Sequence, residues 1–230
     1  DGDKFKISDG GALGTNDRYT LDSSGVHTFG DGGSSNYLEI EADGTLEFVG
    51  DATVWDDLRV AVNSVKVPAS NNPAWTAYSA SQLLGFSYQS VEGNEEEVYF
   101  VAQLPHSYKE GSNVTPHVHW VPNEDTTDDP EVVRWGLEYE WVNIGSSFSG
   151  TTTIYAEESM TDEADKHQMT NFSAIDGTGK TISSMIVCRL FRNSSHANDT
   201  YDSGSALALL LEIDFHYEQD TVGSRAITTK

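Results

Sequence analysis

The sequence predicts an all-β protein, with an antiparallel jelly-roll or sandwich head preceded by a short β-rich N-terminal anchor or shaft. Apolar and polar residues alternate in segment after segment, which is the period of a half-buried strand. Clusters of Gly, Asn, Asp and Ser separate these segments, as they do in turns. No stretch shows a sustained helical period; the nearest, residues 161–169, has room for two helical turns. The length of 230 residues suits one large β domain with a small appendage, or two small domains.

The first part of the chain is short-segmented and rich in turns. We assign residues 1–54 to the anchor or shaft and residues 55–230 to the head. Tyr37–Val49 is the clearest hairpin candidate, because both arms alternate around Ala42-Asp43-Gly44. A lone hairpin buries little apolar surface. The anchor therefore needs a neighbouring domain, or copies of itself from other chains.

Longer strands follow from Trp55 onward. In the longest, Val132–Ile144, the alternate residues from Val133 to Trp141 are apolar and form one face. In the last, the alternation predicts that Leu207, Leu209, Leu211, Ile213 and Phe215 point inward. The expected strands are Arg59–Val67, Gln82–Tyr88, Glu97–Leu104, His117–Val121, Val132–Ile144, Thr151–Glu157, Gln168–Ile175, Ser184–Arg192 and Leu207–Glu218. Strands of this number and spacing indicate a sandwich or jelly roll.

The segment Leu104–Trp120, LPHSYKEGSNVTPHVHW, concentrates unusual residues in one strand–loop–strand unit. Pro105 should end the incoming strand, because it has no N–H for the ladder. On the outgoing strand, Val118 and Trp120 are expected to enter the core. His117 and His119 then lie about 6–7 Å apart on the opposite face, because side chains alternate along a strand.

The composition excludes several classes of partner. The formal net charge of −24 argues against binding to nucleic acid or to an anionic membrane surface. The longest apolar run, Ala206–Leu211, is far shorter than the roughly 20 residues of a membrane-spanning helix. The single cysteine, Cys188, excludes an internal disulfide and alternates like a small core residue.

A metal site is the main chemical alternative. Gly111, the pair His117 and His119, and then Glu124 follow a spacing that resembles the first metal motif of the cupin family. That resemblance implies a jelly roll with a divalent ion such as iron, manganese or nickel, and His216 could supply a further ligand. The second motif of that family is missing. We therefore predict no cofactor and no metal, and we retain His117, His119 and His216 merely as candidate ligands.

The alternative for these three histidines is a surface or a subunit interface. Each lies on the polar face of a strand whose other face is apolar. The nearby carboxylates that could pair with them are Glu138, Glu212 and Asp214.

Asp125, Asp128 and Asp129 form a second, acidic candidate. Oxygen-rich loops can hold calcium, but these residues lack the ordered spacing of an EF-hand. We expect a solvated turn here.

Three separated segments together resemble virion structural proteins of tailed bacteriophages, of the fibre or decoration type. They are GDATVWDDLRV (Gly50–Val60), LPHSYKEGSNVTPHVHW (Leu104–Trp120) and IDFHYEQDTVGSR (Ile213–Arg225). The resemblance implies a non-enzymatic protein of the virion, a homotrimer that attaches to other virion proteins through its N-terminal segment. The alternatives are a receptor-binding tip that recognises host surface glycans, and a cupin-like metal enzyme.

Overall fold

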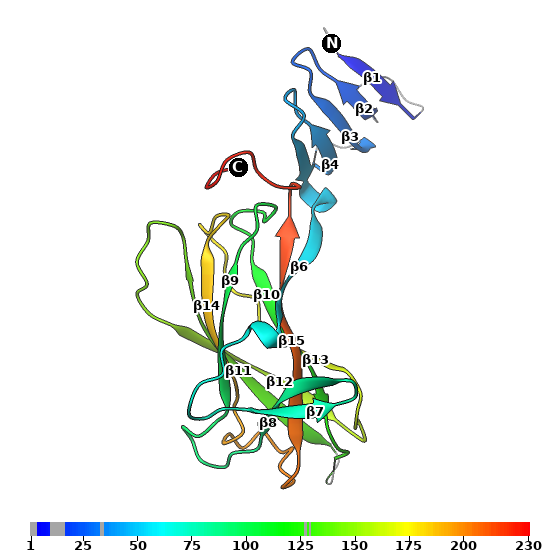
Figure 1. The fold of residues 1–230 in the computed structure, drawn as a ribbon. Helices are drawn as coiled ribbons and strands as arrows, with labels where there is room; N and C mark the ends of the chain where they lie inside the picture. Colours follow the sequence, from blue (N-terminus) through cyan, green and yellow to red (C-terminus); the bar gives the residue numbers. More distant parts are fainter. Residues whose placement is uncertain (1–3, 10–16, 33–34, 127, 129) are drawn as a thin grey trace.

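The computed structural model describes residues 4–9, 17–32, 35–126, 128 and 130–230. In these residues the regular structure consists of three antiparallel β-sheets and two short 3-10 turns, which confirms the all-β prediction. Two of the sheets form the head. The third is built from the N-terminal strands and projects from one end of the head (Figure 1). No helix in the described part of the chain is long and apolar enough to cross a membrane.

The N-terminal sheet is a simple meander of five strands. Neighbours in sequence are neighbours in space, in the order β1-β2-β3-β4-β5. The hairpin expected at Tyr37–Val49 is confirmed, and Gly44 takes the positive φ of 87° that its turn requires. The strands are β1 (Phe5–Ser8), β2 (Asp17–Leu21), β3 (His27–Gly32), β4 (Tyr37–Ile40) and β5 (Leu46–Val49).

The strand register gives this sheet one apolar and one largely polar face. Residues directly opposite each other in an antiparallel ladder point to the same side. Phe5 pairs with Leu21, Tyr19 with Phe29, and so on across the sheet. One face therefore carries Phe5, Ile7, Tyr19, Leu21, His27, Phe29, Leu38, Ile40, Leu46 and Phe48, and the other carries Lys6, Thr20, Thr28, Glu39 and Glu47 among others.

A 3-10 turn, Gly50–Ala52, leads from this sheet into β6 (Val54–Ala61). β6 pairs along the second half of β15 (Leu207–Gln219) and so enters the head. We expected the first head strand at Arg59–Val67. It begins five residues earlier and ends at Ala61, where a second 3-10 turn, Val62–Ser64, interrupts it.

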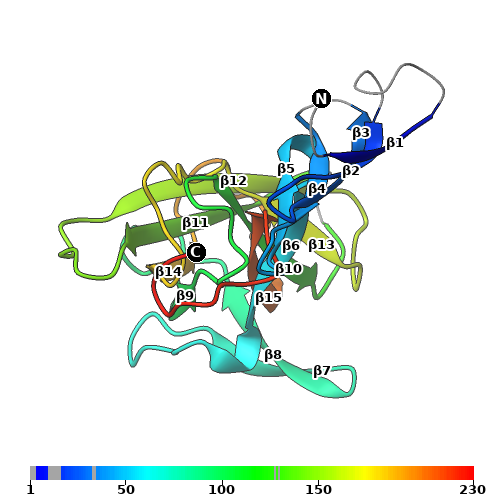
Figure 2. The same cartoon turned by 90° about the horizontal axis from the view of Figure 1, so that it is seen from above.

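Two sheets pack face to face in the head (Figures 1 and 2). The first head sheet has the order β13-β10-β15-β8-β7, with β6 also on β15; the second has the order β12-β11-β14-β9. The remaining bounds are β7 (Ala74–Tyr78), β8 (Ser81–Ser87), β9 (Glu97–Gln103), β10 (Val114–Pro122), β11 (Glu131–Val142), β12 (Thr152–Met160), β13 (Gln168–Asn171) and β14 (Met185–Arg192).

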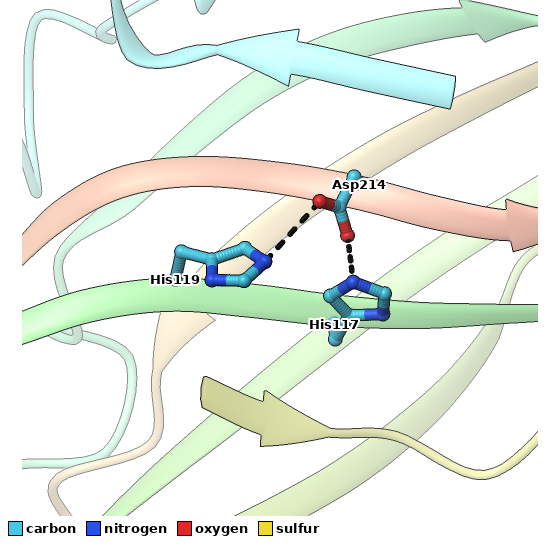
Figure 3. A group of neighbouring side chains, drawn as sticks. All are labelled: His117, His119 and Asp214. Atoms are coloured by element: carbon cyan, nitrogen blue, oxygen red, sulfur yellow. Dashed lines mark ion pairs between the residues drawn. The ribbon is translucent and has the colours of Figure 1, made fainter. Parts of the chain in front are cut away.

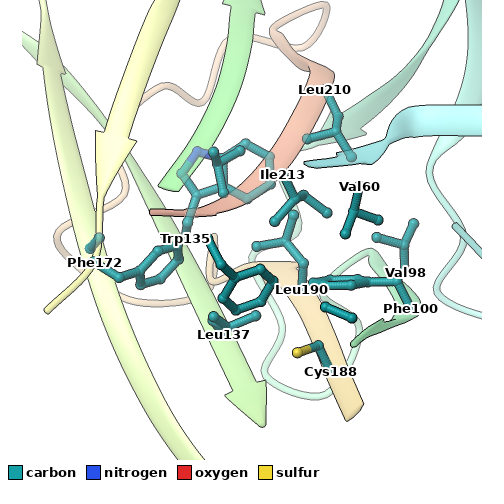
Figure 4. Close-up of a cluster of buried hydrophobic side chains, with 14 of the residues drawn as sticks. Val60, Val98, Phe100, Trp135, Leu137, Phe172, Cys188, Leu190, Leu210 and Ile213 are labelled. Carbon is teal, nitrogen blue, oxygen red and sulfur yellow. The ribbon is translucent and has the colours of Figure 1, made fainter. Parts of the chain in front are cut away.

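The core lies between these two sheets (Figure 4). Trp120 on β10 and Trp135 on β11 are fully buried and meet with ring centroids 6.1 Å apart. Val118 and Trp120 point inward as predicted, and Cys188 is a buried core residue as predicted. Burying a side chain of this size stabilises a fold by about 1.5–3 kcal/mol, so this interface dominates the stability of the head.

The prediction for the inward face of β15 is wrong in its first half. Glu212 lies opposite His119, but Leu210 lies opposite Trp120, so Leu211 is an extra residue in the ladder. Such a β-bulge shifts the alternation by one residue. Ile213 and Phe215 enter the core as predicted, but before the bulge the inward residues are Ala208 and Leu210, whereas Leu207, Leu209 and Leu211 pack on the opposite face with Leu83 and Val121.

The two helical turns considered for residues 161–169 are also wrong. Residues 161–166 form turns and bends, and β13 begins at Gln168. Asp162 and Asp165 have φ values of 47° and 60°, which no right-handed helix accepts. Aspartate tolerates this conformation because its side chain bonds to nearby backbone groups.

Candidate functional site

The strongest cluster of titratable side chains lies on the outer face of the first head sheet, at the centre of the β10–β15 ladder. His117 and His119 alternate with the core residues of β10, so both point away from the core. His117 lies directly opposite Asp214 of β15. Asp214 in turn alternates with two core residues, so the register alone brings the two histidines and this carboxylate to one place.

The Asp214 carboxylate lies between the two imidazoles (Figure 3). Nε2 of His117 forms a close ion pair with Oδ1 of Asp214, and Nε2 of His119 lies 3.3 Å from Oδ2. The two imidazole centroids are 5.2 Å apart. One donor atom from each of the three residues lies within 4.8 Å of the others. We call these three residues the His–Asp cluster.

The cluster is unusually buried for the outer face of a sheet. Asp214 is only 3% exposed, and His117 is also buried. Burial lowers the pKa of His117, but the hydrogen bond and the charge of Asp214 raise it more, with further help from Asp57 and the Thr115 backbone, so the net shift is upward. The imidazolium form is favoured here because a carboxylate lies beside it.

His216, the third predicted candidate, lies beside this cluster but is not part of it. Its imidazole centroid is 6.1 Å from that of His117. Nδ1–H of His216 donates a hydrogen bond to the carboxylate of Asp57 on β6 over 2.7 Å, and the ring stacks on Trp55 with centroids 4.9 Å apart. His216 is therefore held by its own carboxylate and indole partners.

Of the three carboxylates considered as histidine partners, only Asp214 contacts a histidine of the cluster. Glu212 pairs with Arg59. Glu138 belongs to the second head sheet, where it binds Arg189 and Thr151.

The cupin-like ligand set is not assembled. Both carboxylate oxygens of Glu124 accept hydrogen bonds from serine hydroxyls, those of Ser203 and Ser205, and Glu124 is not among the clustered donor atoms. Gly111, the first residue of that pattern, lies in a turn with φ 82°.

The second, acidic candidate is not assembled either, because Asp125 and Asp128 are not among the clustered donor atoms of the described residues. Asp125 caps the turn that contains Ala164, whose N–H lies 2.9 Å from Oδ1. The backbone N–H of Asp128 donates to Glu131. Asp129 lies outside the described residues.

Sequence reasoning missed His167 as a member of this region. Its Nε2 lies 2.7 Å from Nδ1 of His119, so the two rings share one proton in a hydrogen bond. His167 falls in the segment for which two helical turns were considered, and only the pairing of β13 with β10 reveals its position. A signal was present, because a histidine directly precedes the Gln168–Ile175 strand candidate.

The apolar face of the N-terminal sheet is a second candidate, for assembly rather than chemistry. None of the described residues from Lys4 to Arg59 whose burial is known is buried. On this face, Phe5 is 59% exposed, Ile7 53% and Phe29 42%. An exposed face on which apolar side chains gather is typical of an interaction surface.

Comparisons with known proteins assign no family. No protein-family model matches the chain, and no curated protein sequence matches it. One similar solved structure is the CBM36-1 domain of a multidomain xylanase from the hindgut metagenome of Trinervitermes trinervoides, with 11% identity over 70% of this chain and 96% of that chain and a TM-score of 0.35. Another is TmCBM61 in complex with beta-1,4-galactotriose, with 11% identity over 72% of this chain and 88% of that chain and a TM-score of 0.29.

Proposed function

We propose that this chain is a non-enzymatic structural protein of a bacteriophage particle. It assembles as a homotrimer through its N-terminal sheet, which also attaches it to other virion proteins, and it presents the β-sandwich head outward. The single observation that carries the proposal is the uncovered apolar face of the N-terminal sheet. The resemblance of the Gly50–Val60, Leu104–Trp120 and Ile213–Arg225 segments to phage fibre and decoration proteins supplies the virion context.

The N-terminal sheet needs a second layer to hold it together. Ordering a residue costs about 1–2 kcal/mol in backbone entropy alone. An isolated single-layer sheet offsets this cost poorly, because both of its faces remain in water. Further copies of the same sheet supply the missing layer, since three apolar faces can pack against each other around a common axis. The polar face, with Lys6, Glu39 and Glu47, then faces solvent.

A small set of contacts fixes the N-terminal sheet to the head. The backbone N–H of Phe48 donates to the carbonyl of Asp220 over 2.6 Å, and the Thr221 hydroxyl donates to the carbonyl of Leu46 over 2.7 Å. Arg225 pairs with Asp43 at the tip of the hairpin. The C-terminal residues therefore anchor β5 at the junction, where Figure 1 places the C-terminus. These contacts connect the N-terminal sheet to the head, as a protein that transmits mechanical load between a shaft and a head requires.

Exposed tryptophan favours one alternative, a receptor-binding tip that recognises host surface glycans. Trp75 is 47% exposed and lies on β7, the last strand of the first head sheet. Indole rings offer a flat apolar surface with one donor, which suits contact with a sugar ring. Binding of the chain to a glycan array, lost in Trp75→Ala and retained in Trp55→Ala, would favour this role.

The assembly half of the proposal is tested by truncation. Sedimentation equilibrium of the full chain should return about 75 kDa, three times the 25.1 kDa of one chain. A chain spanning Trp55–Lys230 should sediment as a folded monomer. A full chain that remained monomeric at tens of micromolar would contradict this half.

The virion half is tested on the particle itself. Purified particles of the phage whose genome encodes the chain should contain it at a multiple of three copies, by quantitative mass spectrometry. Particles assembled with the Trp55–Lys230 form should lack it. Complete absence of the full chain from mature particles would contradict a structural role.

A further inference from the structure

We propose that the His–Asp cluster is a binding site for one divalent transition-metal ion of the zinc class. His117 and His119 would supply Nε2 and Asp214 a carboxylate oxygen. This departs from the interpretation that the sequence favours, a surface or interface without metal, and it goes beyond the structural function proposed above.

The three donor atoms of the His–Asp cluster need to move only slightly closer together to hold an ion. In a tetrahedral zinc site the metal–ligand bonds are about 2.0–2.2 Å, so neighbouring donor atoms lie roughly 3.3 Å apart. The three donor atoms already lie within 4.8 Å of one another, and Nε2 of His119 is 3.3 Å from Oδ2 of Asp214. All three come from the paired strands β10 and β15, so the backbone holds them in place.

Asp214 supplies an independent reason to expect a cation. Its Oδ1 is buried, and its partner is Nε2 of His117, which forms a close ion pair with it when the imidazole is protonated. A buried carboxylate without a compensating donor or cation is costly. Arg59, which lies opposite Asp214 on β6, is committed through two nitrogens to Glu212. A bound metal ion would supply the compensating charge in place of the proton that His117 holds.

The outer partners orient both imidazoles as they do in metal sites. A metal-ligating histidine usually donates its second ring N–H to a carbonyl, a carboxylate or another acceptor. His117 bonds to the backbone of Thr115, and because its Nε2 faces Asp214, Nδ1 is the nitrogen available for this bond. His119 uses Nδ1 toward Nε2 of His167, at 2.7 Å. With both Nδ1 atoms committed in this way, loss of the proton from each Nε2 leaves a lone pair that faces the carboxylate, and a metal ion can bind there in place of the proton.

The donor set selects the class of ion. Two imidazoles and one carboxylate suit zinc, nickel, cobalt or iron, whereas magnesium and calcium prefer sites built from oxygen alone. Three protein ligands leave at least one position for water. The chain's formal charge of −24 and the neighbouring Asp57 add to the local attraction for a cation.

The direct test is calorimetric titration of zinc chloride into the full chain after treatment with a chelator, at pH 7.5. We expect one zinc ion per chain with a dissociation constant in the micromolar range or below, and no binding of magnesium at the same concentration. His119→Ala and Asp214→Asn should each weaken zinc binding at least tenfold. His196→Ala, at an exposed loop histidine outside the cluster, should bind zinc as the parent does.

Several results would overturn the site. These are no zinc binding to the parent at 100 µM, equal binding by His119→Ala and the parent, or equal binding of magnesium. The first would mean that a proton alone bridges the His–Asp cluster. If Asp214→Asn does not fold by circular dichroism, His119→Gln serves in its place, because the His119 side chain is 21% exposed and tolerates change. Sedimentation of the parent with and without chelator separates this site from the proposed assembly, which should not change.

Discussion

The N-terminal sheet and the head are built from the same kind of strand but are stabilised in different ways. In both, apolar and polar residues alternate and one face is apolar. In the head, two such faces meet, and residues such as Trp120, Trp135 and Leu137 are fully buried between them. In the N-terminal sheet no described residue of known burial is buried. The alternation therefore defines a face, and a second layer decides whether that face becomes a core. For the head that layer comes from the same chain, and for the N-terminal sheet we propose that it comes from other copies.

The largest expected loss of stability tests whether the head is stabilised by burial within its own chain. Arg192 and Asp199 form a fully buried ion pair, and Arg192 also donates to the carbonyl of Phe86 over 3.0 Å. Arg192→Met leaves Asp199 as an unpaired buried charge, so we expect the head to lose about 3–5 kcal/mol of unfolding free energy. Urea unfolding, followed by tryptophan fluorescence, measures the loss.

The matched control for this change lies at the junction with the N-terminal sheet. Arg225→Met removes the exposed pair with Asp43, where water compensates the charge. The urea midpoint of the head should stay where it is. Equal losses from both substitutions would contradict the view that burial in the head decides the cost.

A smaller effect is expected at Gly136 in the second head sheet, where the ring of Phe191 lies close to the backbone. A Cβ on Gly136 of β11 would lie 2.2 Å from the ring of Phe191. Gly136→Ala must displace that ring, at a cost of about 1–3 kcal/mol. Gly204→Ala, where an added Cβ meets no atom within 4 Å, is the control and should leave thermal unfolding unchanged. If Gly136→Ala melts like the parent, the packing around Phe191 is looser than described.

The smallest effect on the head is expected from a change in the N-terminal sheet. Phe29→Asp places a charge on the apolar face, which should prevent assembly while the head keeps its urea midpoint. Val101→Asp is the control, because Val101 is 51% exposed on β9 of the head and should leave the trimer intact. Sedimentation velocity distinguishes the two variants. Dissociation by Val101→Asp but not by Phe29→Asp would move the interface to the head.

Much of the architecture could be predicted because alternation is a local property. It placed Val118 and Trp120 in the core and His117 and His119 on the other face, and it located the Tyr37–Val49 hairpin. The wrong or missing predictions concern features that no local sequence pattern marks. The extra residue Leu211 in β15 reverses the alternation, yet nothing in ALALLLEID marks a bulge. The edge strand β7 was missed because it is only five residues long.

The candidate site was predictable in part. The spacing of His117 and His119 showed that they share a face, and Asp214 was one of three carboxylates considered as partners. The choice among the three depends on the register between β10 and β15, which connects residues about a hundred positions apart. Local sequence does not contain that register. His167 depends in addition on the pairing of β13 with β10, and it was therefore missed.

We propose that contacts between chains order the N-terminal sheet, and two properties recorded together decide whether they do. The mass and the amide hydrogen exchange of the full chain are recorded on the same sample at micromolar concentration. Our account predicts about 75 kDa, three times the 25.1 kDa chain, with slow exchange in β2, β3 and β4 that is lost on dilution into the monomer. A 25 kDa monomer in which these strands remain protected would contradict it.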